Sequence, residues 1–256
     1  MLNYIKSEFY RITHSAMLYA VGFAFVAAPT LMNIMLYCFT LSKPDYPFST
    51  TSFSFSNVVA NPMVFCVAAL FLVYALYEGN KKNGNLKNAI ASGLSRGKIF
   101  MGQVIVCLVV SIIFLAITAI VYIFSARLLL RIEGPVTAFD LIMEILAVAP
   151  IAIAALILSV VVVMRFDKSF MGIIWWICIL FLVPQLLLYI GLEIEPVREI
   201  AMWLPRNFFS GMQVNQTVCA PIWDTASGLA KCLISGSIGI VVFGIYGIIS
   251  LRKKEF

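Results

Sequence analysis

Residues 145–164 read ILAVAPIAIAALILSVVVVM, a continuous run without a charged side chain. An α-helix needs about 20 mostly apolar residues to cross the hydrocarbon core of a bilayer, which is the length of this run. The run does not alternate between apolar and polar residues, as a strand of a membrane barrel would. It therefore predicts a membrane-spanning helix.

Five further apolar runs accompany it in the 256-residue chain. The six expected spans, none of which contains Asp, Glu, Lys, Arg or His, are residues 16–39, 58–77, 99–124, 145–164, 170–191 and 232–251. Apolar residues make up 62% of the chain, against roughly 45–50% in soluble domains. A soluble fold cannot bury that much apolar surface, which excludes a soluble enzyme, a disordered chain and a nucleic-acid-binding module. We predict an all-α polytopic membrane protein with a single domain over residues 1–256.

The basic residues predict how the chain is oriented in the bilayer. Twelve of the 18 Lys and Arg lie in the N-terminal segment, residues 78–98, residues 165–169 and the C-terminal tail. An even number of spans places these four segments on one side, and the positive-inside rule makes that side cytoplasmic. The formal net charge of +6 is therefore explained by membrane orientation and needs no nucleic-acid partner. Eight of the twelve acidic residues lie on the other side.

Two segments outside the spans are predicted to lie at the membrane surface. In residues 1–15, Leu2, Ile5, Phe9 and Ile12 recur at helical spacing and predict an amphipathic elbow helix, with a disordered basic start as the alternative. Near residues 184–185 a proline interrupts the fifth span before the outer loop 192–231. We expect a broken span followed by an outer interfacial or re-entrant helix with one apolar face along residues 196–209, or else a simple proline kink and a solvated loop. The expected interface anchors are Trp203, Phe208, Phe209 and Trp223.

The composition argues against chemistry within this chain. The six cysteines form no CxxC pair, and His14 is the only histidine, which argues against a zinc site or a histidine relay. Gly79 and Gly84 have the spacing of a phosphate loop, but the Lys and Ser/Thr that such a loop requires are missing. The spans lack the ionisable groups that proton- or ion-coupled transporters use. We therefore predict a non-enzymatic chain without metal or cofactor, whose transport energy comes from elsewhere.

The sixth expected span carries small residues that permit close contact between helices. They are Ser235, Gly236, Gly239, Gly244 and Gly247. Small residues let two helix backbones approach each other in a membrane. We expect these residues to pack within the chain, with a seam between two copies as the alternative.

The cytoplasmic loop 78–98 is the most informative hydrophilic segment. Leu86, Ile90 and Leu94 form a thin apolar stripe, and Gly84 and Gly93 bracket a short expected helix. Such a helix can dock into a groove on a soluble partner. Alternatively, the basic residues of the loop only anchor anionic headgroups. Physical reasoning alone leaves both roles open.

This loop also carries a resemblance to a known family. Its pattern is Glu-x5-Gly-x-Leu-Lys-Asn-x4-Gly-x-Ser-Arg-x2-Ile-Phe over residues 78–100. With six spans and both ends inside, it resembles the permease subunit of ABC-2-type transporters, in particular permeases of bacteriocin (lantibiotic) immunity and bacitracin-type export systems. Gln103 departs from the pattern, since many relatives have Lys there. The resemblance implies that the ATPase-coupling residues are Glu78, Gly84, Leu86, Lys87, Asn88, Ile90, Gly93, Ser95 and Arg96.

The resemblance also implies outer half-helices between the last two spans, over residues 185–211, together with partners and a mechanism. A separate ATP-binding-cassette ATPase dimer would bind ATP and receive the loop helix, and a second permease chain, identical or a sister, would complete the transport path. The chain would then be an exporter subunit in a bacterial cell membrane, moving an amphipathic or apolar cargo such as an antimicrobial peptide, a drug or a lipid. The alternative is a non-transporting immunity or sensor protein that binds an antimicrobial peptide.

Overall fold

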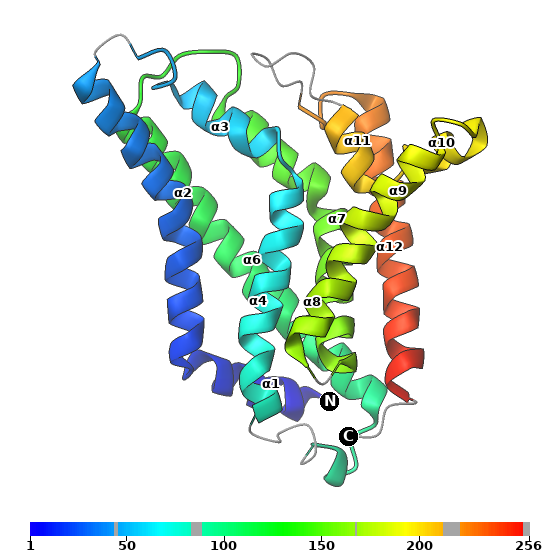
Figure 1. Ribbon diagram of the computed structural model, residues 1–256. Coiled ribbons are helices and arrows are strands. Elements are labelled where there is room, and N and C mark those ends of the chain that lie inside the picture. Colours follow the sequence, from blue (N-terminus) through cyan, green and yellow to red (C-terminus); the bar gives the residue numbers. More distant parts are fainter. Residues whose placement is uncertain (44–45, 83–88, 167, 212–220, 253–256) are drawn as a thin grey trace.

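The computed structural model describes residues 1–43, 46–82, 89–166, 168–211 and 221–252 (Figure 1). Within these ranges the chain is helical, and the one strand-like contact is an isolated bridge between Thr50 and Arg131. The helices are α1 (Leu2–Thr13), α2 (Ala16–Ser42), α3 (Thr51–Val59), α4 (Met63–Lys82), α6 (Arg96–Leu129), α7 (Ala138–Arg165), α8 (Ser169–Ile177), α9 (Val183–Ile190), α10 (Glu195–Ala201), α11 (Pro205–Gly211) and α12 (Ala226–Arg252). The predicted all-α fold is confirmed.

The described residues contain five helices long and apolar enough to cross a membrane, or six spans if one bent pair is counted. α1 and the last turns of α12 lie at the same end of the bundle (Figure 1). We call this end the terminal face and the opposite end the distal face. This placement agrees with an even number of spans.

The second span differs from the straight helix predicted over residues 58–77. α3 ends at Val59 and α4 begins at Met63, and the two helices are bent by 71° relative to each other. Pro62 lies in the break, and proline both lacks a backbone N–H and disfavours helical geometry at the residue before it. The prediction of a continuous helix is therefore wrong, because the proline divides the run.

A buried polar network holds α3 against α2 and α6. The Ser54 hydroxyl donates to Asn33 Oδ1 at 2.6 Å, and Asn33 Nδ2 donates to Ser125 Oγ at 2.8 Å. The Tyr122 hydroxyl donates to the Ser54 carbonyl at 2.7 Å. Polar groups buried away from water need such partners, so these bonds allow hydrophilic residues to lie inside an apolar bundle.

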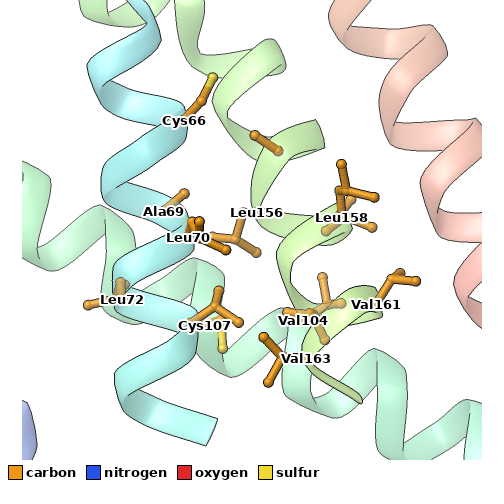
Figure 2. Packing of buried hydrophobic residues seen from close by; sticks show 14 of the residues in the cluster. Cys66, Ala69, Leu70, Leu72, Val104, Cys107, Leu156, Leu158, Val161 and Val163 are labelled. Atoms are coloured by element: carbon orange, nitrogen blue, oxygen red, sulfur yellow. The ribbon is translucent and has the colours of Figure 1, made fainter. Parts of the chain in front are cut away.

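α7 occupies the centre of the bundle. It packs against α4, α6, α8 and α12, and most of its terminal-face half is buried. Figure 2 shows Leu70 of α4 and Leu156 of α7 pointing toward each other, with Cys107 of α6 and Val163 of α7 below them. Since lipid tails are as apolar as these side chains, close van der Waals packing rather than water exclusion stabilises this core.

α12 lies directly on α7 because glycines leave room for the approach. A Cβ atom added at Gly236 would lie 2.5 Å from Pro150 Cβ, and one at Gly239 would lie 2.8 Å from Ala154 Cβ. At Gly247 it would meet the Phe100 ring at 2.5 Å, whereas Gly244 has no neighbour within 4 Å. The expectation that these small residues pack within the chain is confirmed for Gly236, Gly239 and Gly247.

The fifth span is irregular. α8 is followed by a π-helical turn over Cys178–Leu182, and α9 contains Pro184, which cannot donate a backbone hydrogen bond. At Gly191 the chain turns back so tightly that a Cβ atom would lie 2.6 Å from the Arg198 Cα. The expected half-helices are thus present at the distal face as α9, α10 and α11.

Two details of the outer segment differ from the sequence prediction. Residues 196–209 do not form one helix, since α10 ends at Ala201 and α11 begins at Pro205. Phe208 and Phe209 are buried in the core rather than placed as interface anchors, whereas Trp203 is exposed. The amphipathic segment is therefore helical, but it forms two short helices instead of one, and the second begins at Pro205.

Candidate functional site

α1 lies across the terminal face and packs on α4 and α6 (Figure 1). Its packed face is formed by Tyr4, Ile5, Glu8, Phe9 and Ile12. The amphipathic elbow helix is therefore present, but Leu2, which the periodicity places on the apolar face, is 74% exposed. The buried face of α1 also includes a charged residue that hydropathy alone would place outside.

That charged residue takes part in an ion pair. Arg11 Nη2 donates to Glu8 Oε2 at 2.9 Å and to the Leu76 carbonyl of α4 at 3.3 Å. The ion pair lies within α1 and holds the guanidinium in place, and the hydrogen bond from Arg11 to Leu76 ties α1 to α4 just before the loop that the sequence analysis singled out.

A second contact ties α1 to the beginning of α6. The Tyr4 hydroxyl donates to Gln103 Oε1 at 3.3 Å, and burial raises the pKa of Tyr4 above its usual range. The Tyr4 ring also lies against Gly102, where a Cβ atom would be 2.8 Å away. Gln103, the position at which the sequence departs from the family pattern, is thus buried under α1.

Between α4 and α6, the described part of the loop is a capped helical end. Gly93 has φ +84°, its N–H donates to the Ile90 carbonyl at 2.9 Å, and the Leu94 N–H donates to the Ala89 carbonyl at 3.2 Å. This pair of bonds is a Schellman cap, which requires a left-handed residue that glycine adopts at low cost. The glycine at this position therefore fixes where the short helix stops.

The structure separates the predicted coupling residues into three groups. Gly84, Leu86, Lys87 and Asn88 lie outside the described residues, and Glu78 belongs to the last turns of α4. Ile90 and Leu94 pack against the main core cluster, which anchors the capped helix to the bundle. Ser95 is the N-cap of α6 and Arg96 its first residue, so the loop passes without a gap into a spanning helix.

The sequence analysis missed one buried acidic residue at the distal face. It began the fourth span at residue 145, but α7 begins at Ala138 and includes Glu144, so the expectation that the spans lack acidic residues is wrong for α7. Thr137 and Asp140 form a capping box that starts the helix earlier than hydropathy indicates, and the Thr-x-x-Asp spacing was the available signal.

Glu144 is 0% exposed and contacts the segment that precedes α12. Its Oε2 atom accepts hydrogen bonds from the backbone N–H groups of Ile222 at 2.9 Å and Trp223 at 3.3 Å. Among the residues that the structure describes, neither its buried Oε1 atom nor the buried Trp223 Nε1 atom has a hydrogen-bond partner. Over the residues that the structure describes, no group of three or more His, Cys, Asp or Glu side chains could hold a metal ion.

The comparisons with known proteins identify the family. The family model described as "ABC-2 family transporter protein" matches residues 4–185, which is well over half of the chain. The chain belongs to the ABC-2 transporter family. No curated protein and no solved structure matches it.

The ABC-2 match covers both sites described above. It includes α1, the loop between α4 and α6, and Glu144, and it ends within α9, before α10, α11 and α12. The chain is accordingly a membrane-embedded component of an ABC transporter, with several membrane-spanning helices.

Proposed function

We propose that this ABC-2 chain is the permease subunit of an exporter in a bacterial cell membrane, with both termini cytoplasmic. A separate ATP-binding-cassette ATPase dimer binds and hydrolyses ATP and docks on the terminal face at the loop 78–98. A second permease chain, identical or a sister, completes the transport path. The cargo is amphipathic or apolar, such as an antimicrobial peptide, a drug or a lipid.

The observation that carries the docking proposal is the anchored helix end before α6. Ile90 and Leu94 pack on the core, Gly93 caps the helix, and α6 begins two residues later at Arg96. A partner that moves this segment would therefore move α6 with it, because no flexible linker lies between them. Closure of an ATPase dimer can drive such rigid-body motion of helices.

The contacts of α1 support the same function. Through Arg11 and Tyr4, α1 is bound both to the end of α4 and to the beginning of α6, the two helices that flank the loop. Force applied to the loop is thus distributed over both spans rather than over one.

The distribution of charge supports an external energy source. Among the described residues, the buried Asp, Glu, Lys and Arg side chains are Glu8 and Glu144, which lie at opposite ends of the bundle. A proton- or ion-driven transporter needs ionisable groups along its path. The side chains that the spans expose are instead largely apolar, as with Phe23, Ile120 and Val242, which suits an amphipathic or apolar cargo.

The test is purification of the tagged chain from membranes of its native host, followed by identification of bound proteins and measurement of ATP hydrolysis. We expect an ATP-binding-cassette ATPase to co-purify with the wild type and to be lost with Ile90→Pro, which breaks the short helix. Ile132→Pro, at an exposed position on the distal side, is the matched control and should retain the ATPase. Equal recovery with Ile90→Pro would contradict the docking site, and directional transport by the chain alone in liposomes would contradict the need for an ATPase.

A further inference from the structure

Glu144 is the buried acidic side chain for which the proposed mechanism has no use. Its carboxyl group is enclosed by α7 and by the segment that precedes α12, yet the two backbone donors both bind Oε2. Oε1 has no partner among the described residues. If the carboxyl group is ionised, Oε1 has no donor to accept from. If Oε1 is protonated, its O–H has no acceptor. In either form the group lacks a hydrogen-bond partner at Oε1.

No basic side chain of the described residues pairs with Glu144. Residues 212–220, which directly precede this segment, contain no Lys, Arg or His. The sequence next to the site therefore supplies no counter-charge. A buried carboxylate is costly unless it is paired, and an ionisable group within a span is a functional-site hypothesis by default.

The charges around the site indicate the sign of the missing partner. On the distal side of the spans, eight acidic residues face six basic ones, whereas the terminal side has a large basic excess. Asp224, one residue after Trp223, is exposed. This net acidic excess on the distal side favours a cation over an anion.

We propose that Glu144 binds a positively charged, hydrogen-bond-donating group of the transported molecule, an ammonium or a guanidinium, through its unpartnered Oε1 atom. This inference rests on the proposed transport function, since the bound cation is cargo only if the chain is a transporter. It narrows the class of cargo to cationic amphipathic molecules. The backbone of Ile222 and Trp223 lies against the Glu144 carboxyl group in this conformation, so the cation gains access when the segment 221–225 moves.

The experiment measures binding by the chain alone, so that it does not depend on an ATPase. The chain is placed in phosphatidylcholine nanodiscs, and its melting temperature is recorded with dodecylammonium and with dodecanol, which share an apolar tail. At ten times its dissociation constant, a bound ligand should raise the melting temperature by about 3–6 °C. We expect this increase with dodecylammonium, relative to dodecanol, in the wild type.

Two variants locate the effect. Glu144→Gln keeps an oxygen that accepts the two backbone N–H groups, so it should fold, and it should lose the ammonium-specific increase. Glu133→Gln removes an exposed acidic group on the same side and should keep the increase. The absence of a difference between the two probes in the wild type would overturn the proposal, even if Glu144→Gln failed to fold. An undiminished difference in Glu144→Gln would overturn it equally.

The failure of this inference and the failure of the proposed function give different results. Ammonium binding without a co-purifying ATPase would leave the cation site intact and remove the docking proposal. Co-purification of an ATPase that is lost with Ile90→Pro, together with no ammonium binding, would support the docking proposal and remove the cation site.

Discussion

Gly93 offers the sharpest test of how the loop is held to α6. Its φ of +84° lies in the left-handed region, but a Cβ atom added there would have no neighbour within 4 Å. Gly93→Ala therefore introduces backbone strain without a steric clash. For an L-residue this conformation costs about 1–2 kcal/mol, which corresponds to an increase of about 5–30-fold in the population of the opened turn.

Hydrogen exchange measures this population directly. The relevant amides are those of Gly93 and Leu94, because they donate the two bonds of the cap. In Gly93→Ala their exchange should be faster by about 5–30-fold, because exchange of a locally opened segment follows its opening free energy. The recovery of a bound ATPase should fall in the same variant if the capped helix is the docking element.

Gly97→Ala is a matched control. Gly97 also has open space around the added Cβ atom, but its φ is not positive, and it lies in the first turn of α6. Alanine is about 0.5–1 kcal/mol more favourable than glycine in a helix, so exchange in this region should stay the same or become slower. Exchange in Gly93→Ala that equals that of the wild type would refute the reasoning, since it would show that the cap does not limit opening.

Two further substitutions test the bundle itself by thermal unfolding in detergent. Asn33→Leu removes the buried hydrogen bonds of Asn33 to Ser54 and Ser125, which join α2 to α3 and α6, and should cost about 1–3 kcal/mol; an unchanged melting temperature would show that these bonds contribute nothing. Gly236→Leu should separate α12 from α7 at Pro150 and lower the melting temperature by several degrees, whereas Gly244→Leu, which faces open space, should not.

Much of the fold could be predicted because a bilayer makes continuous apolar runs almost unambiguous. The irregular parts could not, since they depend on contacts distant in sequence. α3, which reads TSFSFSNVV, begins with hydroxyl-rich residues that hydropathy places outside a span, and it is helical in the bundle because Asn33 and Tyr122 satisfy Ser54. The 71° bend had a local signal in Pro62, but its size depends on how α3 packs on α6 and α7.

The capped helix at Gly93 could be predicted from local sequence, whereas the buried Glu144 could not. The glycine at residue 93 predicts a helix end from sequence, because a Schellman cap needs a left-handed residue. Glu144 could not be predicted as buried, because hydropathy ends a span at the first charge. Only the return of the chain through Ile222 and Trp223 encloses that carboxyl group, and no local pattern encodes such a contact.

The packing of α12 determines where the distal face can open. At Gly236, Gly239 and Gly247 its backbone lies so close to its neighbours that added Cβ atoms would fall 2.5–2.8 Å from α7 or from Phe100. Moving this stretch away would forfeit van der Waals contacts along several turns, which are the main source of helix association in a membrane. Before Gly236, the two hydrogen bonds to Glu144 and the ring contact between Phe139 and Trp223 join α7 to the entry to α12. Opening at Glu144 is therefore expected to bend α12 near Gly236 rather than to displace the whole helix.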